Sequence, residues 1–209
     1  MRPHIILNTA MSVDGKISRP GERILFSNIF DKMRVRQLRR RVDGIMVGIN
    51  TVLVDDPKLT ASNHREKNPV RIIVDSAAKT PPGARVLNDD ASTIIVAAMD
   101  APYDNVRTLK NKADVIFAGK GRVDLYMMLI QLYERGIKKV LLEGGGILNH
   151  SMLKEGYVDE IFVTIAPTII GDGVDFVRGE MKKEIKLKLC GIFQLGDQIV
   201  IHYFPHYEL

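Results

Sequence analysis

The chain has 209 residues, of which 45% are hydrophobic and 26% are charged, a balance typical of one globular domain. No apolar run approaches the roughly 18 residues that a membrane-spanning helix needs, and no secretory signal is visible at the N-terminus. Cys190 is the single cysteine, which excludes an internal disulfide and a multi-cysteine metal site. We therefore expect a single cytoplasmic domain over residues 1–209, with no membrane partner. The net charge of +5 is compatible with nucleic acid, an anionic surface or a small phosphorylated ligand.

Short runs of β-branched and apolar residues predict β-strands along most of the chain. In chain order the predicted strands cover residues 5–8, 44–48, 70–75, 93–98, 115–118, 139–143, 160–166, 185–193 and 198–204. Helices are predicted at 28–42, capped by Ser27, at 123–135, ended by Gly136, and at about 147–155. Because strands and helices alternate, we expect an α/β fold with a mostly parallel sheet. Only a short stretch that includes Leu195, Gly196 and Asp197 separates the last two strands, which predicts a C-terminal antiparallel hairpin and hence a mixed sheet.

The first polar segment, N-T-A-M-S-V-D-G-K-I, follows the first predicted strand, and α/β sheets usually place their ligands at such strand ends. Asn8 supplies a hydrogen-bond donor, Ser12 a hydroxyl and Lys16 a positive charge for a phosphate. Asp14 and Gly15 also fit an ordinary turn. The segment therefore predicts either a ligand site or a simple turn.

A second polar segment, G-I-N-T-V-L-V-D-D-P-K-L-T, follows the second predicted strand. Thr51 and Asp55 are four residues apart, so they share a face if this stretch is helical. The alternative is a capped turn that ends at Pro57. We expect no metal here or elsewhere, because no histidine or third carboxylate lies near Asp55 and Asp56, and the five histidines have no ligand spacing.

Two glycine-containing turns follow later strands. In L-L-E-G-G-G-I-L-N, a strand runs through Glu143 into three glycines and a helix, an arrangement that lets backbone N–H groups approach an anion. A tight turn without a ligand is the alternative. In A-G-K-G-R, Gly119 lies beside positive charge, which fits either a pyrophosphate contact or a plain loop. Neither turn matches the dinucleotide fingerprint or the P-loop.

The predicted first helix carries many basic residues between Lys32 and Arg41. A solvated face is the usual meaning of such a run. Nucleic-acid binding is an alternative that we do not expect, because no aromatic residues interleave the charges. A single arginine reaching a substrate phosphate fits better. No motif for covalent catalysis is present.

Taken together, these segments resemble the archaeal and fungal 2,5-diamino-6-ribosylamino-pyrimidinone 5′-phosphate reductases, and they are similar to the reductase domain of the bacterial bifunctional riboflavin deaminase-reductase. The matching motifs are S-V-D-G-K-I at 12–17, G-I-N-T-V-L-V-D-D-P-K-L-T at 48–60, P-V-R-I-I-V-D-S at 69–76, L-L-E-G-G-G at 141–146, and V-D-E-I with I-A-P at 158–167. The resemblance implies a dihydrofolate-reductase-like three-layer fold, a homodimer, and NADPH as hydride donor, with NADH as the alternative donor.

The resemblance also implies roles for individual residues. Cofactor contacts are expected at Ala10, Thr51, Asp55, Ser76, Gly144, Gly145, Gly146, Ile147 and Leu148, joined by the Gly119 turn. Substrate contacts are expected at Asn8, Asp14, Arg39, Leu59 and Glu143, joined by Lys16. Asp14 and Glu143 are the candidate catalytic residues. An arginine expected shortly after Thr60 is absent; Ser62 stands there, leaving Arg65, Lys16 or Arg39 to bind the phosphate.

The implied reaction reduces the ribosylamino group of a phosphorylated pyrimidine to a ribitylamino group in riboflavin biosynthesis. Ring opening gives a Schiff base, and hydride from nicotinamide C4 reduces C1′, so the protein mainly positions its ligands. Two alternatives stay open. One is a pterin or dihydrofolate reductase on the same fold; the other is a nucleic-acid-binding protein that uses the basic helix.

Overall fold

The computed structural model describes residues 1–61 and 68–208. Contacts among these residues divide the chain into two compact units. Unit 1 comprises Met1–His4 and Arg36–Leu141, and unit 2 comprises Ile5–Val35 and Leu142–Leu209. Each unit is therefore built from two separate stretches of the sequence, and the expectation of one domain stays a prediction.

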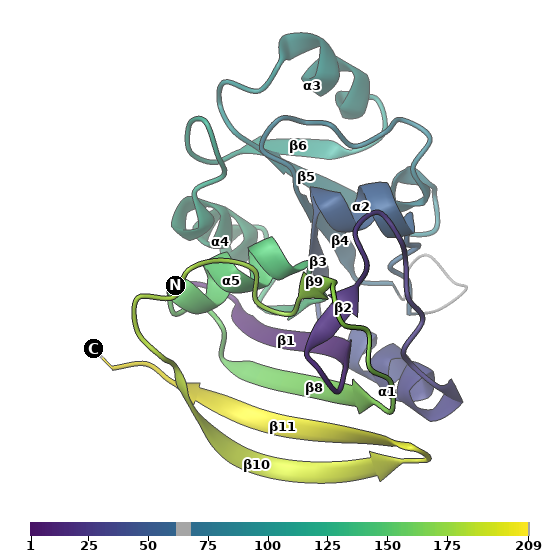
Figure 1. The fold of residues 1–209 in the computed structure, drawn as a ribbon. Helices are drawn as coiled ribbons and strands as arrows, with labels where there is room; N and C mark the ends of the chain where they lie inside the picture. The colour runs from purple at the N-terminus through teal and green to yellow at the C-terminus, as the bar shows by residue number, and fades with distance from the viewer. Residues whose placement is uncertain (62–67, 209) are drawn as a thin grey trace. The chain divides into compact units, whose positions relative to one another are not determined.

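Unit 1 contains a sheet whose strand order is β7, β3, β4, β5, β6 (Figure 1). The strands are β3 (Gly44–Gly48), β4 (Val70–Val74), β5 (Thr93–Ala97), β6 (Asp114–Phe117) and β7 (Lys139–Leu142), whose last residue belongs to unit 2. Strands β3 to β6 run parallel. Their side chains are buried almost without alternation, as expected for strands covered on both faces.

The longest helix that lies wholly within unit 1, α4 (Leu125–Glu134), illustrates how local sequence fixes an element. The side chain of Asp124 accepts a hydrogen bond from the N–H of Met127 and caps the helix start. The residues Leu125, Met128, Leu129 and Leu132 form its buried face, and their spacing of three and four is that of one helix side. Gly136, at φ 83°, follows the helix end.

Unit 1 also contains α2 (Ile49–Asp55), α3 (Tyr103–Lys110) and the 3-10 turn η2 (Arg85–Leu87). None of these was predicted. Helix α3 is only eight residues long and has no side-chain cap, so it lacks the capping signal that helps to find a helix in a sequence. Helix α2 has seven residues and likewise lacks a side-chain cap.

Unit 2 contains a mixed sheet with the strand order β10, β11, β8, β1 (Figure 1). Its strands are β1 (His4–Ser12), β8 (Glu160–Ala166), β10 (Lys186–Leu195) and β11 (Gln198–His206). Strands β1 and β8 are parallel, whereas β8, β11 and β10 are successively antiparallel. The predicted C-terminal hairpin is confirmed; its two-residue turn has Gly196 at φ 66°.

Helices α1 (Ile29–Arg39) and α5 (Gly146–Lys154) and the small sheet of β2 (Lys16–Ser18) and β9 (Val174–Asp175) complete the elements of the described chain. Helix α1 starts in unit 2 and ends in unit 1. The predicted cap of this helix was wrong: the side-chain oxygen of Asn28, and not that of Ser27, accepts a hydrogen bond from the N–H of Asp31. Ser27 instead donates to the Asp31 carboxylate. The short strands β2 and β9 were not predicted, since two or three residues carry no periodic signal.

Candidate functional site

The turn that leaves β1 in unit 2 is fixed by its own polar side chains. The N–H of Lys16 donates to the Ser12 hydroxyl over 2.9 Å. The carboxylate of Asp14 accepts hydrogen bonds from the N–H groups of Ile170 and Gly171, which follow β8. Asp14 therefore joins the loops after two neighbouring parallel strands, at the edge of the sheet where α/β proteins usually bind ligands.

These contacts also set the charge of Asp14. The Ser12 hydroxyl and then the Gly171 N–H stabilise the ionised form and lower the pKa of Asp14 from 3.8 to about 2. Asp14 is ionised at neutral pH and carries no proton to give to a substrate. Its position favours a role in holding the loops, and this argues against Asp14 as the proton donor.

The lowered pKa predicts how an Asp14→Asn variant behaves with pH. A group whose pKa is lower in the folded state stabilises the fold above its unfolded pKa, and this contribution is lost as the pH falls toward the folded pKa. The melting temperature of the variant should therefore lie below that of wild type from pH 8 to about pH 5, and the gap should shrink between 3.8 and about 2. Thermal melts across this range test the assignment. A gap that stays constant down to the lowest pH would contradict it.

The side chain of Lys16 is engaged within unit 2. Its Nζ forms an ion pair with Asp175 of β9, and the Lys16 side chain is 22% exposed. The hydrogen bond that Lys16 donates to the Asp175 carboxylate raises the pKa of Lys16. A substrate phosphate at Lys16 would have to compete with this carboxylate. The structure therefore favours a role for Lys16 in holding β2 against β9.

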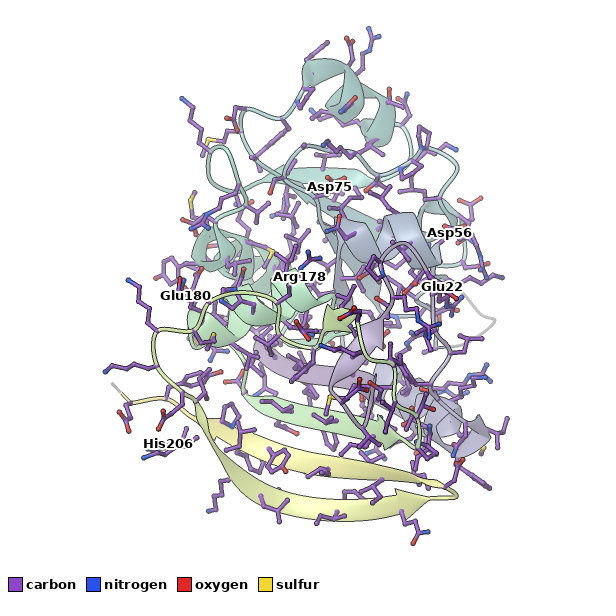
Figure 2. The ribbon with its side chains drawn as sticks, viewed as in Figure 1. Glu22, Asp56, Asp75, Arg178, Glu180 and His206 are labelled. Atoms are coloured by element: carbon purple, nitrogen blue, oxygen red, sulfur yellow. The ribbon has the colours of Figure 1, made fainter. Side chains whose placement is uncertain are left out.

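The E-G-G-G turn leads from β7 into α5. Glu143 is half-buried at the end of the strand, and Gly144 has φ 101°, which favours glycine. A Cβ on Gly146 would lie 2.3 Å from the carbonyl oxygen of Asp175 and 3.1 Å from Cβ of Arg178. The N–H of Arg178 donates to the carbonyl of Gly146. The turn is thus packed against the segment after β9, on which Figure 2 labels Arg178 and Glu180.

The residues in the first turn of α5 differ in whether a ligand could contact their side chain or only their backbone. Gly145 precedes the helix, and no side chain caps it, so a ligand would meet backbone N–H groups at a positive dipole end. The side chain of Ile147 is 51% exposed, whereas that of Leu148 is only 7% exposed. A bound cofactor would therefore touch the side chain of Ile147 and only the backbone at Leu148.

Asn8 and Ala10 lie on the same face of β1, because they are two residues apart in a strand. Asn8 is 7% exposed and Ala10 is half-buried. The Asn8 side-chain oxygen accepts a hydrogen bond from Arg34 of α1 over 2.8 Å. Sequence reasoning missed Arg34, because it lies within a basic run that is typical of a solvated helix face.

In unit 1, Thr51 and Asp55 lie one turn apart on α2, so they share the face that their spacing allows in a helix. The loop that follows is backbone-strained: Asp56 has φ 38° and Leu59 has φ 50°, both in the left-handed region that costs most side chains energy. Leu59 is only 2% exposed, so its side chain belongs to the core of unit 1. The N–H of Arg85 donates to the carboxylate of Asp56 and holds this loop in place.

Ser76 and the Gly119 turn, predicted separately, are brought together in unit 1. The Ser76 hydroxyl accepts a hydrogen bond from the N–H of Val123 over 3.0 Å, and the Gly119 carbonyl accepts one from the N–H of Met99. Gly119 has φ 76°, and a Cβ there would lie 2.7 Å from the carbonyl oxygen of Arg122. The ends of β4, β5 and β6 therefore form one compact set of loops.

Asp75, just before Ser76, is a second residue that sequence reasoning missed (Figure 2). It is 1% exposed, and its Oδ2 accepts hydrogen bonds from both the N–H and the hydroxyl of Thr80. Asp75 thereby closes the loop that carries Ser76. An aspartate at the end of a strand reads as a simple turn residue in the sequence, which hides this role.

Arg39 donates a hydrogen bond from its Nη1 to the carbonyl of Thr60 over 2.9 Å, so it supports the loop at which the substrate phosphate was expected. Ser62, which stands where an arginine was expected, and Arg65, a candidate phosphate ligand, lie outside the described residues. In the described ranges 1–61 and 68–208, no cluster of three histidine, cysteine or acidic side chains is placed to hold a metal ion. No helix in those ranges is long and apolar enough to span a membrane.

The fold and these strand-end loops define an α/β protein whose fold is like that of the dihydrofolate reductases. A dihydrofolate reductase from Enterococcus faecalis, solved with NADP(H), shares the fold with a TM-score of 0.54 at 10% identity. The RibD protein of Acinetobacter baumannii matches 99% of the chain with a TM-score of 0.82 at 24% identity, and the chain spans 59% of that longer protein. The predicted dihydrofolate-reductase-like fold is thus confirmed.

The particular family follows from the sequence. The RibD C-terminal domain model matches residues 3–201. A protein from Methanothermobacter thermautotrophicus named 2,5-diamino-6-ribosylamino-4(3H)-pyrimidinone 5′-phosphate reductase is 47% identical over 97% of this chain and 98% of its own length. One of the same name from Aquifex aeolicus is 37% identical over 97% and 96%. The chain belongs to the RibD C-terminal domain family.

Proposed function

We propose that this protein is an NADPH-dependent reductase of riboflavin biosynthesis. Its substrate would be 2,5-diamino-6-ribosylamino-4(3H)-pyrimidinone 5′-phosphate, whose ribosylamino group it would reduce to ribitylamino. The observation that carries the proposal is the near full-length identity of 47% to a reductase of that name. The strand-end loops that hold Asn8, Asp14, Ser76 and the E-G-G-G turn support it from the structure.

The chain offers suitable groups for a nicotinamide dinucleotide. Gly146 admits no side chain, and the uncapped start of α5 offers N–H groups suited to a phosphate. When bound, NADPH would supply the hydride that reduces C1′ of the ring-opened substrate. In unit 2 we propose Ala10 and the Gly144, Gly145, Gly146, Ile147 and Leu148 turn as its contacts; in unit 1 we propose Thr51, Asp55, Ser76 and Gly119.

The proton that the reaction needs is best assigned to Glu143. Asp14, the other candidate, is held ionised by its lowered pKa of about 2. Glu143 is half-buried and follows directly after β7, immediately before the glycines of the turn. There it would contact the pyrimidine close to the sugar nitrogen, and Asn8, also in unit 2, would orient the ring. In unit 1, Arg39 is the proposed contact for the phosphate-bearing end.

A Glu143→Gln variant tests this assignment. Loss of a general acid is expected to lower kcat by about 100-fold or more, with NADPH affinity little changed. A matched control is Glu155→Gln, an exposed glutamate just past the end of α5. If Glu143→Gln kept wild-type kcat, or if Glu155→Gln lost as much activity, Glu143 would not be the proton donor.

The substrate class is tested by measuring NADPH oxidation with the ribosylamino-pyrimidine phosphate and, separately, with dihydrofolate. We expect turnover with the first substrate alone and stronger use of NADPH than of NADH. Turnover of dihydrofolate alone would replace the proposal with a pterin-type reductase. Salt-dependent binding to any DNA duplex, with no NADPH binding, would support the nucleic-acid alternative.

We also propose that the chain works as one reductase domain and forms a homodimer in the cytoplasm. The exposed side chains of Leu187, Leu189, Ile192 and Ile199 are each 44–61% accessible. The irregularity at Cys190 in β10 puts Leu187, Leu189 and Ile192 on one face of the hairpin, opposite the register positions of Pro205, Tyr203 and Ile201. An apolar stripe on an edge strand is suited to a second copy of the chain.

Sedimentation equilibrium is expected to give twice the chain mass of 23.4 kDa. An Ile192→Glu variant should be monomeric, because the interface would bury an unpaired charge. Lys188→Glu, on the opposite face of β10, is the control and should stay dimeric. A monomeric wild-type protein would contradict the dimer.

A further inference from the structure

Arg34 of α1 is the centre of a buried polar network in unit 2. Its Nε donates to Oδ1 of Asp31 over 2.9 Å, and its Nη2 donates both to Asn8 Oδ1 over 2.8 Å and to Thr164 Oγ1 over 3.1 Å. Asp31 is 1% exposed and Thr164 is fully buried. Three distant parts of the sequence therefore meet at one guanidinium.

The direction of every hydrogen bond in this network is determined. The Asp31 carboxylate only accepts, and it receives the hydroxyls of Ser27 and Thr164 besides Arg34 Nε. Because the Thr164 hydroxyl hydrogen goes to Asp31, its oxygen is left to accept from Arg34. A guanidinium only donates, so the atom of Asn8 that faces Arg34 must be the amide oxygen. The amide nitrogen of Asn8 then points away from Arg34.

Ring contacts hold the guanidinium in this orientation. Arg34 lies 5.7 Å from the ring centroid of Phe162, and the Phe162 ring stacks with that of His202 at 4.1 Å. Asn8, Phe162 and His202 are register neighbours across β1, β8 and β11, so they line one face of the sheet. A cation placed over an aromatic ring at this distance is a favourable contact, and arginine makes it more often than lysine.

The network leaves one donor of Arg34 unused. Nη1 is buried and has no hydrogen-bond partner among the described residues, and an unpaired buried donor is costly to a fold. The guanidinium is therefore anchored through Nε and Nη2 alone, and Nη2 is the atom that holds Asn8.

We propose that Arg34 is a positioning residue that locks the amide of Asn8 with its Nδ2 presented to the substrate. Nδ2 has no partner among the described residues, while Oδ1 is held by Arg34. The substrate atom that meets Asn8 is then a hydrogen-bond acceptor, such as a carbonyl oxygen or an unprotonated ring nitrogen of the pyrimidine. This inference rests on the proposed reductase function.

An Asn8→Asp variant tests which atom is presented. The new carboxylate still accepts from Arg34, so folding should be preserved, but a second acceptor replaces the Nδ2 donor. KM for the pyrimidine substrate is expected to rise by about 30-fold or more, because an acceptor facing an acceptor leaves both unpaired. Melting temperature and NADPH affinity should stay close to wild type.

Arg34 variants test the positioning role. Arg34→Met frees the Asn8 amide to turn over, and we expect KM for the pyrimidine to rise by about 10-fold with a smaller change in kcat. Arg34→Lys retains one donor toward Asn8, so its KM should be about 3-fold lower than that of Arg34→Met. Lys32→Met removes an exposed cation from the same helix and should leave KM unchanged.

The outcomes separate the inference from the proposed function. If wild-type protein oxidises no NADPH with the pyrimidine, the proposed function itself fails. If wild type is active but Asn8→Asp keeps wild-type KM, the amide does not present its nitrogen and the inference is overturned. If the Arg34 variants lower the melting temperature alone, with KM unchanged, Arg34 is merely structural and the positioning role is overturned.

Discussion

The free energy of unfolding of an Arg71→Met variant is expected to be about 3–5 kcal/mol lower than that of wild type. This is the range seen when one member of a buried charged network is removed and its partners are left unpaired. Arg71 lies in β4 and is completely buried. Its Nη1 donates to the carbonyls of Val86, Asn88 and Ala91, and its Nη2 donates to the side-chain oxygen of Asn88. Methionine would leave these carbonyls buried without a donor. Domain stabilities are only about 5–15 kcal/mol, so the loss would be severe.

Chemical denaturation of both proteins measures this difference. Arg107→Met on α3 is the matched control, because Arg107 is exposed and its ion pair with Asp104 is solvent-accessible; a change under about 0.5 kcal/mol is expected there. Arg71→Lys should fall between the two, since one ammonium cannot reach all four acceptors. An Arg71→Met midpoint equal to that of wild type would show that the loop at 85–91 is held by other contacts.

The second large effect is expected from Gly146→Ala. The added Cβ would stand 2.3 Å from the Asp175 carbonyl oxygen, so β9 and the segment with Arg178 must move or the start of α5 must shift. Overpacking of this kind costs about 1–3 kcal/mol. If the shift falls on the E-G-G-G turn, which we propose as an NADPH contact, NADPH affinity should drop by about 10- to 100-fold.

NADPH binding is measured by fluorescence titration, with Gly83→Ala as the control. Gly83 has no atoms within 4 Å of an added Cβ, and its backbone is not in the left-handed region, so that variant should bind as wild type does. Unchanged NADPH affinity in Gly146→Ala would remove the E-G-G-G turn from the proposed cofactor site.

Much of the fold could be predicted because its signals are local. The buried strands are continuous apolar runs, the hairpin has a glycine at a two-residue turn, and α4 has a cap and an apolar stripe. Helix α3 could not be predicted for the opposite reason, since its eight residues carry no side-chain cap. The cap of α1 was assigned to the wrong residue because Ser27 and Asn28 are both good caps.

The candidate site was predictable only where neighbouring residues define it. Motifs in the sequence predicted the turn after β1 and the E-G-G-G turn. They did not predict that Asp14 accepts N–H groups from the loop after β8, or that Lys16 pairs with Asp175. Arg34 is the clearest example of a residue whose role could not be predicted. Its role depends on hydrogen bonds to Asn8, Asp31 and Thr164, and those contacts form only when distant segments of the sequence fold together.

Transfer of deuterium tests the central proposal most directly. The protein would be incubated with the ribosylamino-pyrimidine phosphate and NADPH carrying deuterium on either face of nicotinamide C4, and the product would be analysed by mass spectrometry and NMR. We expect one of the two labelled cofactors to deliver a single deuterium to C1′ of a ribitylamino product. A product without deuterium from either cofactor, or no conversion of this substrate, would contradict the proposal.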